Sequence, residues 1–540
     1  MRVAVVGGGI AGLATAALLA ADGHEVDLFE QRDDVGGRAG SRSSNGFRFD
    51  TGPSWYLMPE VFDHFFALLG TSSAEQLDLR VLDPAYRVFY EGAPGEGPPP
   101  CLDVRADTGA NLAAFEAIEP GAGAALRSYL ASAREAYDVA LRHFLYTSFT
   151  RPLALASPDV LRRLPRLLPL LARSLESFVA ARFDEVRLRQ VLGYPAVFLG
   201  SSPDRAPSLY HLMSALDLTG GVMYPQGGFT HLISTIARLA SEQGVRIHLG
   251  ARVTEVTTEG LTRRRGRRRA RATGLRWQDS DGTEHVHPAD VVVGAGDLHH
   301  LETRLLPENL RTFPEGYWEG RDPGPGGVLV LLGVRGEVPQ LPHHSLFFTD
   351  DWRANFDAIF GGRVPDPASV YVCKPSATDP DVAPEGHENL FVLVPVPADP
   401  ELGRGGTDGA GSPRVEAVAD AALEQVARWA GVPDLAERIV VRETIGPGDF
   451  AEDLFAWRGG MLGPAHTLRQ SAMFRSRNTS RHVAGLYYAG ASTIPGIGLP
   501  MCLISAELVL KHLRGDTSSS PVPAPVAAQA SPSVRTGPRL

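Results

Sequence analysis

The chain has 540 residues, of which 44% are hydrophobic and 21% charged, so it can bury a sizeable core in a large α/β body or in two or more units. Its net charge of −10 argues against a general nucleic-acid binder, because phosphate binding needs a positive surface. The three cysteines (Cys101, Cys373 and Cys502) lie far apart, which excludes a disulfide framework and offers no zinc spacing. Only two basic residues are lysines, Lys374 and Lys511, which leaves few candidates for Schiff-base chemistry.

The chain opens with a predicted strand, turn, helix and second strand. Residues 2–6 form a short, nearly apolar strand, as expected for a strand buried on both faces of a parallel sheet. A helix over 13–21 follows, and a second strand over 25–29 ends at Glu30. The turn before the helix reads G-G-G-I-A-G, which is the glycine fingerprint of a dinucleotide-binding unit.

Each residue of this fingerprint has an expected role. Gly7 allows the tight turn, Gly9 lets the backbone approach a pyrophosphate at the helix N-terminus, and Gly12 lets helix and strand pack closely. Glu30 can accept a hydrogen bond from a ribose hydroxyl, and it disfavours NADP because a 2′-phosphate needs a basic partner. We therefore predict a dinucleotide cofactor held by these four residues.

Two further glycine boxes follow, at 36–38 and 50–52. With the fingerprint, they resemble the boxes of the FAD-dependent amine oxidase and phytoene desaturase superfamily. In that superfamily the boxes surround the flavin side of FAD, which implies contacts from Gly37, Arg38 and Gly52. Arg38 would offer a planar fork of donors to phosphate or ring oxygens.

An amphipathic segment rich in leucine and arginine lies within residues 86–217. Its apolar residues recur at helical spacing from Val160 to Phe178, and Pro165 and Pro169 interrupt the regularity. Two interpretations stay open. The segment is either a helix lying in lipid headgroups, or a helix packed on the core with a solvated basic face.

The segment Y-P-Q-G-G-F at 224–229 precedes a predicted helix over 230–242 and strands over 244–249 and 251–256. It resembles a segment of the same superfamily in which the backbone of a valine contacts adenine, and Val253 matches that valine. Another strand is predicted over 289–293. Seven arginines occur within 263–271, where we expect a solvated hairpin tip, with lipid contact as the alternative.

The C-terminal glycine box is the strongest single signal. A strand over 486–489 leads into G-A-S-T-I-P-G-I-G-L-P and a helix from about Pro500, so a second helix N-terminus is predicted to point at the cofactor. With the preceding segment 466–475, this box closely resembles bacterial-type phytoene desaturases. The resemblance covers nearly the whole chain, includes a short box at 446–450, and implies FAD contacts from Gly490 and Gly498.

Two departures distinguish the chain from the amine oxidases of the superfamily. Those enzymes carry an acid after the glycine of the last box, where this chain has Ala491, and commonly a lysine near flavin N5. Lys374 lies instead in a segment that resembles desaturases. A flavin amine oxidase is therefore our second hypothesis, and a flavin-free isoprenoid-binding protein is the third.

The resemblance implies a lipid-dissolved C40 polyene substrate, phytoene, which would lose a hydride to the flavin and a proton on the way to lycopene or neurosporene. A related acyclic carotenoid is the alternative, and a quinone or oxygen is the expected electron acceptor. No catalytic acid or base is predicted. Asp50, His211, Asp217 and His466 lie near the boxes, and we expect them to be structural.

The expected fold is α/β: a Rossmann-type FAD-binding domain, discontinuous in sequence, with an inserted sheet-plus-helix region for substrate and membrane docking. The sequence assigns 1–85, 218–300 and 440–515 to the FAD-binding domain, 86–217 and 301–439 to the inserted region, and the Pro/Ala/Ser-rich residues 516–540 to a disordered tail.

Two uncharged stretches, 3–21 and 483–506, are interrupted by glycines, and the second also by prolines. We therefore expect neither a signal peptide nor a membrane span. The predicted location is the cytoplasm, with peripheral attachment to the inner face of the cell membrane. No metal and no nucleic-acid partner are expected.

Overall fold

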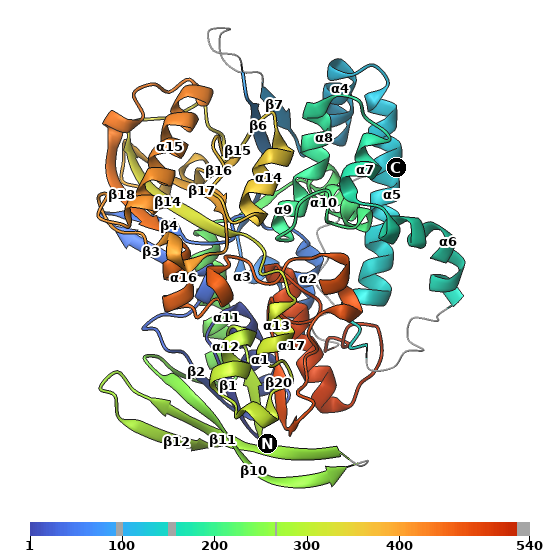
Figure 1. Ribbon diagram of the computed structural model, residues 1–540, viewed down its shortest axis with the longest axis vertical. Helices are drawn as coiled ribbons and strands as arrows, with labels where there is room; N and C mark the ends of the chain where they lie inside the picture. Colours follow the sequence, from blue (N-terminus) through green and yellow to red (C-terminus); the bar gives the residue numbers. More distant parts are fainter. Residues whose placement is uncertain (93–100, 150–157, 265–266, 526–540) are drawn as a thin grey trace.

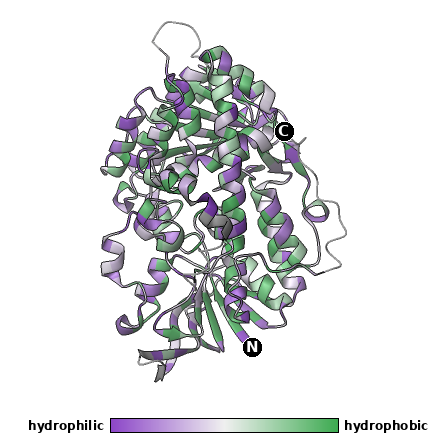
Figure 2. Ribbon diagram, turned by 90° about the vertical axis from the view of Figure 1, so that its right-hand side faces the viewer, coloured by the Kyte–Doolittle hydropathy of each residue, from purple (hydrophilic) through white to green (hydrophobic). Residues whose placement is uncertain are grey.

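The computed structural model describes residues 1–92, 101–149, 158–264 and 267–525. A five-stranded sheet lies in the lower half of the molecule and a seven-stranded sheet in the upper half (Figure 1). The strands of the lower sheet are mostly hydrophobic in sequence (Figure 2). Among the described residues, no helix is both long and apolar enough to cross a membrane.

The lower sheet is parallel and collects strands from distant parts of the chain. In spatial order they are β20 (Leu486–Tyr488), β13 (Val291–Gly294), β1 (Arg2–Val6), β2 (Glu25–Phe29) and β9 (Arg246–His248). Helices α1 (Ile10–Ala21) and α17 (Leu499–Arg514) contact each other and share one hydrophobic core. The sheet therefore brings the N-terminal and C-terminal glycine boxes together, and the predicted strands and helices of both boxes are confirmed within a few residues.

The upper sheet is mostly antiparallel. Its strands, in spatial order, are β18 (Ile439–Ile445), β14 (Gly326–Arg335), β17 (His387–Val396), β16 (Val370–Cys373), β15 (His344–Phe348), β6 (Tyr86–Tyr90) and β7 (Cys101–Val104). The pair β15–β6 is the parallel one among them. Helix α15 (Pro413–Ala430) packs on this sheet through Val415, Ala419 and Trp429.

Two predicted domain boundaries are wrong. The boundary at 440 falls inside β18, which pairs with β14 of the upper sheet. The boundary at 301 falls inside α12 (Leu298–Arg304), and the residues after it, including Phe313 and Trp318, pack on the lower sheet in one cluster with Val6. Both errors arise because burial partners far away in sequence decide which sheet a segment joins.

A third sheet extends below the lower one. It contains β10 (Arg252–Arg264), β11 (Arg267–Gln278) and β12 (Glu284–Pro288), with β19 (Val483–Ala484) beside β11 (Figure 1). Arg264 pairs with Arg267 across the β10–β11 hairpin, which agrees with the expected hairpin; its tip, 265–266, lies outside the described residues. Two small sheets pair β3 (Ser41–Ser44) with β4 (Phe47–Asp50), and β5 (Leu79–Val81) with β8 (Met223–Pro225).

The remaining helices cover the sheets and form a helical layer beside the upper one (Figure 1). They are α2 (Pro59–Leu68), α3 (Ser73–Gln76), α4 (Thr108–Ile118), α5 (Ala122–Ala140), α6 (Pro158–Ala172), α7 (Leu175–Ala180), α8 (Val186–Gly193), α9 (Pro195–Phe198), α10 (Ser214–Gly220), α11 (Gly228–Glu242), α13 (Glu315–Glu319), α14 (Trp352–Phe360) and α16 (Pro447–Asp453). The helical segment predicted from 160 to 178 is two helices. Pro165 and Pro169 lie inside α6, and the chain turns between α6 and α7.

The expectation of a disordered tail from 516 is wrong for residues 516–525. The Lys511 ammonium is buried and donates to the carbonyl oxygens of Ser518 and Ser520 at 2.8 and 2.6 Å, and to that of Tyr146 at 2.9 Å. Val522 is buried, and its N–H donates to Glu507 Oε1. A buried ammonium requires acceptors, and the tail supplies them. Residues 526–540 lie outside the described residues.

Candidate functional site

A cavity of about 690 Å³ runs between the glycine boxes of the lower sheet and the apolar face of the upper sheet. Nine of the ten residues predicted to bind the cofactor line it: Gly7, Gly9, Glu30, Gly37, Arg38, Gly52, Val253, Gly490 and Gly498. These residues come from four separate stretches of the chain. The structure thus brings the predicted cofactor residues to one place.

Gly12, the tenth residue, lies beneath the cavity. A β-carbon at Gly12 would stand 1.9 Å from Gly7 O and 3.3 Å from the Ala295 side chain. Glycine is therefore required there for close packing between α1 and the turn, as the fingerprint predicts. Gly52 shows the same constraint, because its β-carbon would stand 1.9 Å from Arg38 O.

Glu30 lies at the end of β2 with both carboxylate oxygens facing backbone donors. Gly8 N–H donates to Oε2 at 2.6 Å and Arg32 N–H to Oε1 at 3.0 Å. Each carboxylate oxygen has a further lone pair, so the side chain can still accept from a ribose hydroxyl. The residue is buried at the cavity wall, where such a bond is shielded from water.

Arg38 is only loosely held within the protein. Its Nη2 lies 3.4 Å from both Asp297 Oδ2 and Gly460 O, and its buried Nε has no hydrogen-bond partner among the residues that the structure describes. A buried donor without an acceptor is costly, so this side chain fits a site in which a bound anion completes its bonds. The donor set and the open backbone at Gly9, where the nearest atom to an added β-carbon is 3.8 Å away, both fit a pyrophosphate-containing cofactor.

The C-terminal box forms a turn that ends at the N-terminus of α17. His466 supports this turn: its Nε2 accepts from Ile497 N–H at 3.1 Å, and its Nδ1 lies 2.7 Å from the Tyr210 hydroxyl. The first bond assigns the proton to Nδ1. Burial holds the pKa of His466 well below its usual range, so the imidazole is neutral.

Beyond the glycine boxes the cavity wall is apolar. Leucines and phenylalanines from the upper sheet and the helical layer dominate it, among them Leu216, Leu329, Leu346, Phe348, Phe391 and Leu393. Trp55 stands in this wall, stacked on His344 at 4.8 Å between ring centroids, and its Nε1–H donates to the Tyr371 hydroxyl. An apolar wall suits a hydrocarbon ligand.

One part of the wall reaches the surface. Leu171 of α6 and Leu468, Met473 and Phe474 line the cavity, and they are also 39%, 47%, 43% and 57% exposed. We call these four residues the apolar rim. Leu168 on the same helix is also exposed. The sequence predicts possible lipid contact only near α6 and at the arginine run. It does not identify the exposed residues of 468–474, although apolar side chains beside Arg469 are a usable signal.

Asp50 and His211 are held by hydrogen bonds to neighbouring elements. The Asp50 carboxylate accepts from Phe229 N–H at 2.8 Å and from Thr230 N–H at 3.0 Å, so it caps the start of α11. His211 is fully buried between Ser208 O and the Ser132 hydroxyl, each 2.9 Å from a ring nitrogen. Burial lowers the pKa of His211 to about 4.

Asp217 is buried behind the cavity wall and accepts from the hydroxyls of Tyr86 and Tyr194 through one oxygen. Its other oxygen, Oδ1, has no hydrogen-bond partner within the described ranges of the chain. Burial raises the pKa of Asp217 to about 6, against the opposing effect of the two hydroxyl donors. Tyr194 lines the cavity, so the hydrogen bond from its hydroxyl connects Asp217 to the cavity wall.

Lys374 is absent from the cavity wall. Its ammonium donates to Val338 O at 2.8 Å and pairs with Glu388 Oε2 at 2.7 Å. Lys374 therefore differs in position, as well as in its surrounding sequence, from the lysine that the amine oxidases commonly have near the flavin. Nearby, His343, His344 and Cys373 are buried, and one possible ligand atom of each lies within 4.8 Å of the others.

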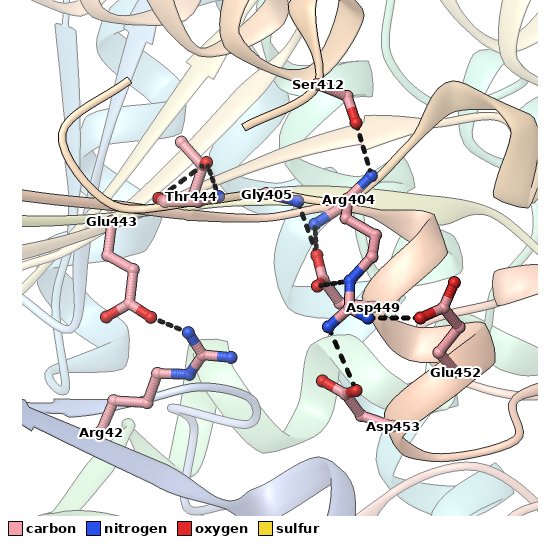
Figure 3. A network of polar contacts seen from close by, with 11 residues as sticks. Arg42, Arg404, Gly405, Ser412, Glu443, Thr444, Asp449, Glu452 and Asp453 are labelled. Atoms are coloured by element: carbon pink, nitrogen blue, oxygen red, sulfur yellow. Dashed lines mark hydrogen bonds and ion pairs between the residues drawn. The ribbon is translucent and has the colours of Figure 1, made fainter. Parts of the chain in front are cut away.

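The short box at 446–450 forms the start of α16, and a polar network fixes it (Figure 3). Asp449 accepts from Gly446 N–H and Gly405 N–H at 2.7 Å each, and Arg404 Nε donates to it at 2.9 Å. Arg404 also pairs with Glu452 and Asp453. The network positions α16, whose Phe450 faces the cavity.

The chain matches the model of the flavin containing amine oxidoreductase family over residues 10–509. It is 40% identical over 515 residues to a carotenoid 3,4-desaturase of Haloarcula japonica, which covers 95% of this chain and 98% of that protein. It is 34% identical over 514 residues to a zeta-carotene-forming phytoene desaturase of Myxococcus xanthus, covering 95% and 93%.

Solved structures share the fold. An oxidoreductase from Methanosarcina mazei has a TM-score of 0.58 at 16% identity, covering 95% of this chain and all of that one. Putrescine oxidase has a TM-score of 0.57 at 16% identity, covering 95% and 99%. The chain therefore belongs to the flavin containing amine oxidoreductase family and, within it, to the carotenoid desaturases, FAD-dependent oxidoreductases that act on carbon–carbon bonds.

Proposed function

We propose that this protein desaturates phytoene, a C40 acyclic carotenoid precursor, toward lycopene or neurosporene. The observation that carries the proposal is the cavity, which leads from the glycine boxes along an apolar wall to the apolar rim. A hydrocarbon offers nothing to hydrogen-bond, so shape, depth and apolar lining must select it. The named relatives support a polyene substrate.

The residues proposed to hold FAD come from the four stretches that meet at the cavity. They are Gly7, Gly9, Gly12, Glu30, Gly37, Arg38, Gly52, Val253, Gly490 and Gly498. Glu30 would accept from the ribose, and Arg38 would complete its bonds on the cofactor. Bound FAD supplies the acceptor for a hydride from the substrate. A water or weak base can take the accompanying proton, since a C–H bond beside an allylic cation is acidic.

The two large sheets would bind different ligands. The lower sheet with its helices forms a discontinuous Rossmann-type FAD-binding domain, and the upper sheet with the helical layer forms an inserted region for substrate. Unlike in the sequence-based division, residues near 301–318 pack with the lower sheet and residues 439–445 belong to the upper sheet.

The apolar rim supports peripheral docking on the inner face of the cell membrane. A C40 polyene hardly leaves a bilayer by itself, since each CH₂ group contributes about 0.8 kcal/mol to its retention. A cavity whose wall continues into exposed leucine, methionine and phenylalanine side chains gives the substrate an apolar route out of the lipid. The electron acceptor would be a quinone or oxygen.

The test is expression in a host that accumulates phytoene, followed by pigment extraction. We expect coloured products whose absorption spectrum gives the number of new double bonds. Colourless phytoene in a host that contains the folded, yellow flavoprotein would contradict the proposal. A second host that accumulates lycopene tests the alternative suggested by the 40% identical relative, desaturation at the 3,4 position.

A further inference from the structure

Arg475 is a buried arginine whose hydrogen bonds within the described part of the chain all go to neutral acceptors. The residue is 4% exposed, and its guanidinium donates to the carbonyl oxygens of Pro464, Gln470, Ala491 and Thr493. The groups with the largest electrostatic effect on it are Tyr210, Tyr317, Cys502 and a second cation, Arg321. None of these is a carboxylate, in contrast to the acid partners of Arg404.

The guanidinium keeps its charge despite this environment. Burial lowers the pKa of Arg475 to about 10, which still leaves it protonated at neutral pH. A buried charge without an ion-pair partner is expensive, and carbonyl dipoles offset only part of the cost. Proteins keep such locally unfavourable features mainly at functional sites, which is expected here if the charge acts on a ligand.

The charge lies behind the turn that closes one end of the cavity. Arg475 binds the carbonyl of Ala491, which lines the cavity, and that of Thr493 in the same turn. Cys502, in the first turn of α17, also lines the cavity, and the positive charges of both Arg38 and Arg475 act on it. Two cations and the positive end of α17 thus converge on this end of the cavity.

We propose that Arg475 tunes the bound flavin: its uncompensated charge favours the reduced cofactor and so makes hydride transfer from the hydrocarbon substrate more favourable. The inference rests on the FAD placement of the proposed function and extends it to a residue outside the glycine boxes. Hydride arriving from the substrate brings negative charge into the site, and a fixed cation in a low-dielectric wall stabilises that charge. The accompanying proton leaves as described above, and the quinone or oxygen takes the two electrons in the next half-reaction.

The test is the midpoint potential of the flavin in the purified holoprotein, measured by reductive titration without any carotenoid. Arg475→Gln keeps hydrogen-bonding capacity and removes the charge, whereas Arg475→Lys keeps the charge and loses most of the bonds. We expect a more negative potential in the Gln variant and a potential near wild type in the Lys variant. Arg238→Gln, at a half-exposed surface arginine paired with Glu242, is the matched control and should leave the potential unchanged.

Unchanged potential in flavin-loaded Arg475→Gln would overturn the proposal, as would equal shifts in both variants, which indicate a structural role. If the variants fail to fold, sulfite addition to the wild-type holoprotein decides, because the adduct is an anion that a nearby cation stabilises. We expect ready bleaching of the flavin by sulfite, and no adduct would overturn the proposal. A Gln variant that folds and binds flavin should bind sulfite about tenfold more weakly than the wild type. None of these measurements uses a carotenoid, so their outcome does not depend on whether the substrate assignment is correct.

Discussion

At the scale of single residues, the cofactor half of the site depends on backbone atoms that approach each other closely. Gly52 is the sharpest case, since the backbone carbonyl that blocks an added β-carbon belongs to Arg38. A carbonyl in a bonded turn cannot move aside as a flexible side chain can. Any side chain at Gly52 must therefore displace the loop that carries the proposed phosphate ligand.

We expect Gly52→Ala to retain the fold and to bind FAD about 5- to 150-fold more weakly, the equivalent of 1–3 kcal/mol of overpacking. The measurement is titration of the apoprotein with FAD, together with the flavin-to-protein ratio after purification. Gly316→Ala is the matched control, because nothing lies within 4 Å of a β-carbon there. Equal FAD affinity in the two variants would refute the close-approach argument.

Asp217 gives a prediction about pH. Its pKa is raised from 3.8 to about 6 in the folded state, so folding favours the protonated carboxyl. The resulting loss of stability begins as pH rises above the unfolded pKa and is complete above the folded one. Across pH 4 to 7 this amounts to about 2–3 kcal/mol.

Asp217→Asn removes the titrating group while leaving an oxygen for Tyr86 and Tyr194. We therefore expect the unfolding free energy of the variant, relative to that of the wild type, to increase as pH rises from 4.5 to 7. Denaturant or thermal unfolding at several pH values measures this difference. A constant difference across the range would show that the carboxyl is already ionised in the folded protein.

At the scale of elements, α16 shows how a short helix is positioned from outside itself. Asp449 accepts from Gly405 and from the Arg404 side chain (Figure 3). It also accepts from Gly446, which lies on a different segment from Gly405. Glu452 also contacts Arg404, but its side chain is 63% exposed. The buried and the exposed carboxylate therefore contribute unequally, although both pair with the same arginine.

We expect Asp449→Ala to lower the unfolding free energy by about 2–4 kcal/mol, because two backbone donors and a guanidinium lose their acceptor. Glu452→Ala should cost less than about 0.5 kcal/mol. Thermal unfolding of the holoprotein compares them. Similar losses in the two variants would mean that Asp449 is not the organising acceptor.

The apolar rim joins α6 to the segment 468–474, two elements distant in sequence. If it contacts lipid, charge on either element should weaken membrane binding. We expect Leu171→Glu and Phe474→Glu each to reduce binding to vesicles about tenfold or more, since burying one such side chain contributes about 1.5–3 kcal/mol. Vesicle flotation measures this.

Val286→Glu is the control for the rim variants. Val286 is 62% exposed on β12, which belongs to the sheet below the cofactor half and lines no part of the cavity. This variant should bind vesicles as the wild type does. Loss of binding in all three variants would indicate an effect of net charge rather than of the rim.

At the scale of the whole molecule, the cofactor half was predictable because its rules are local. The fingerprint from Arg2 to Glu30 is set by spacing within one strand–helix–strand unit, and it appears in the structure nearly as expected. The cavity wall was not predictable, because Leu329, Phe391 and Tyr371 reach it only through the pairing of β14, β17 and β16. Pairing over such sequence separations has no local signature.

The prediction of disorder from residue 516 was wrong for residues 516–525 for a related reason. The segment from Asp516 offers little apolar surface of its own, which is why disorder was expected. Its order depends on Lys511, whose ammonium is fully buried and bonds to Tyr146 and to two tail carbonyls. The acceptors are backbone atoms, so composition could not reveal them. The tail thus links α17 to the segment after α5, which lines the cavity through Leu145 and Phe149.

This arrangement predicts that removal of residues 516–540 destabilises the whole protein by about 3–5 kcal/mol, because it leaves a buried ammonium with one acceptor. Lys511→Met in the truncated chain should recover most of that loss, whereas the same substitution in the full chain should be destabilising. Unfolding of the four proteins forms a double-mutant cycle that isolates the coupling. A chain ending at residue 525 keeps the contacts of Lys511 and is the control. If the shorter truncation behaves like the longer one, or if Lys511→Met has the same effect in both backgrounds, the tail carbonyls are not what stabilises the buried charge.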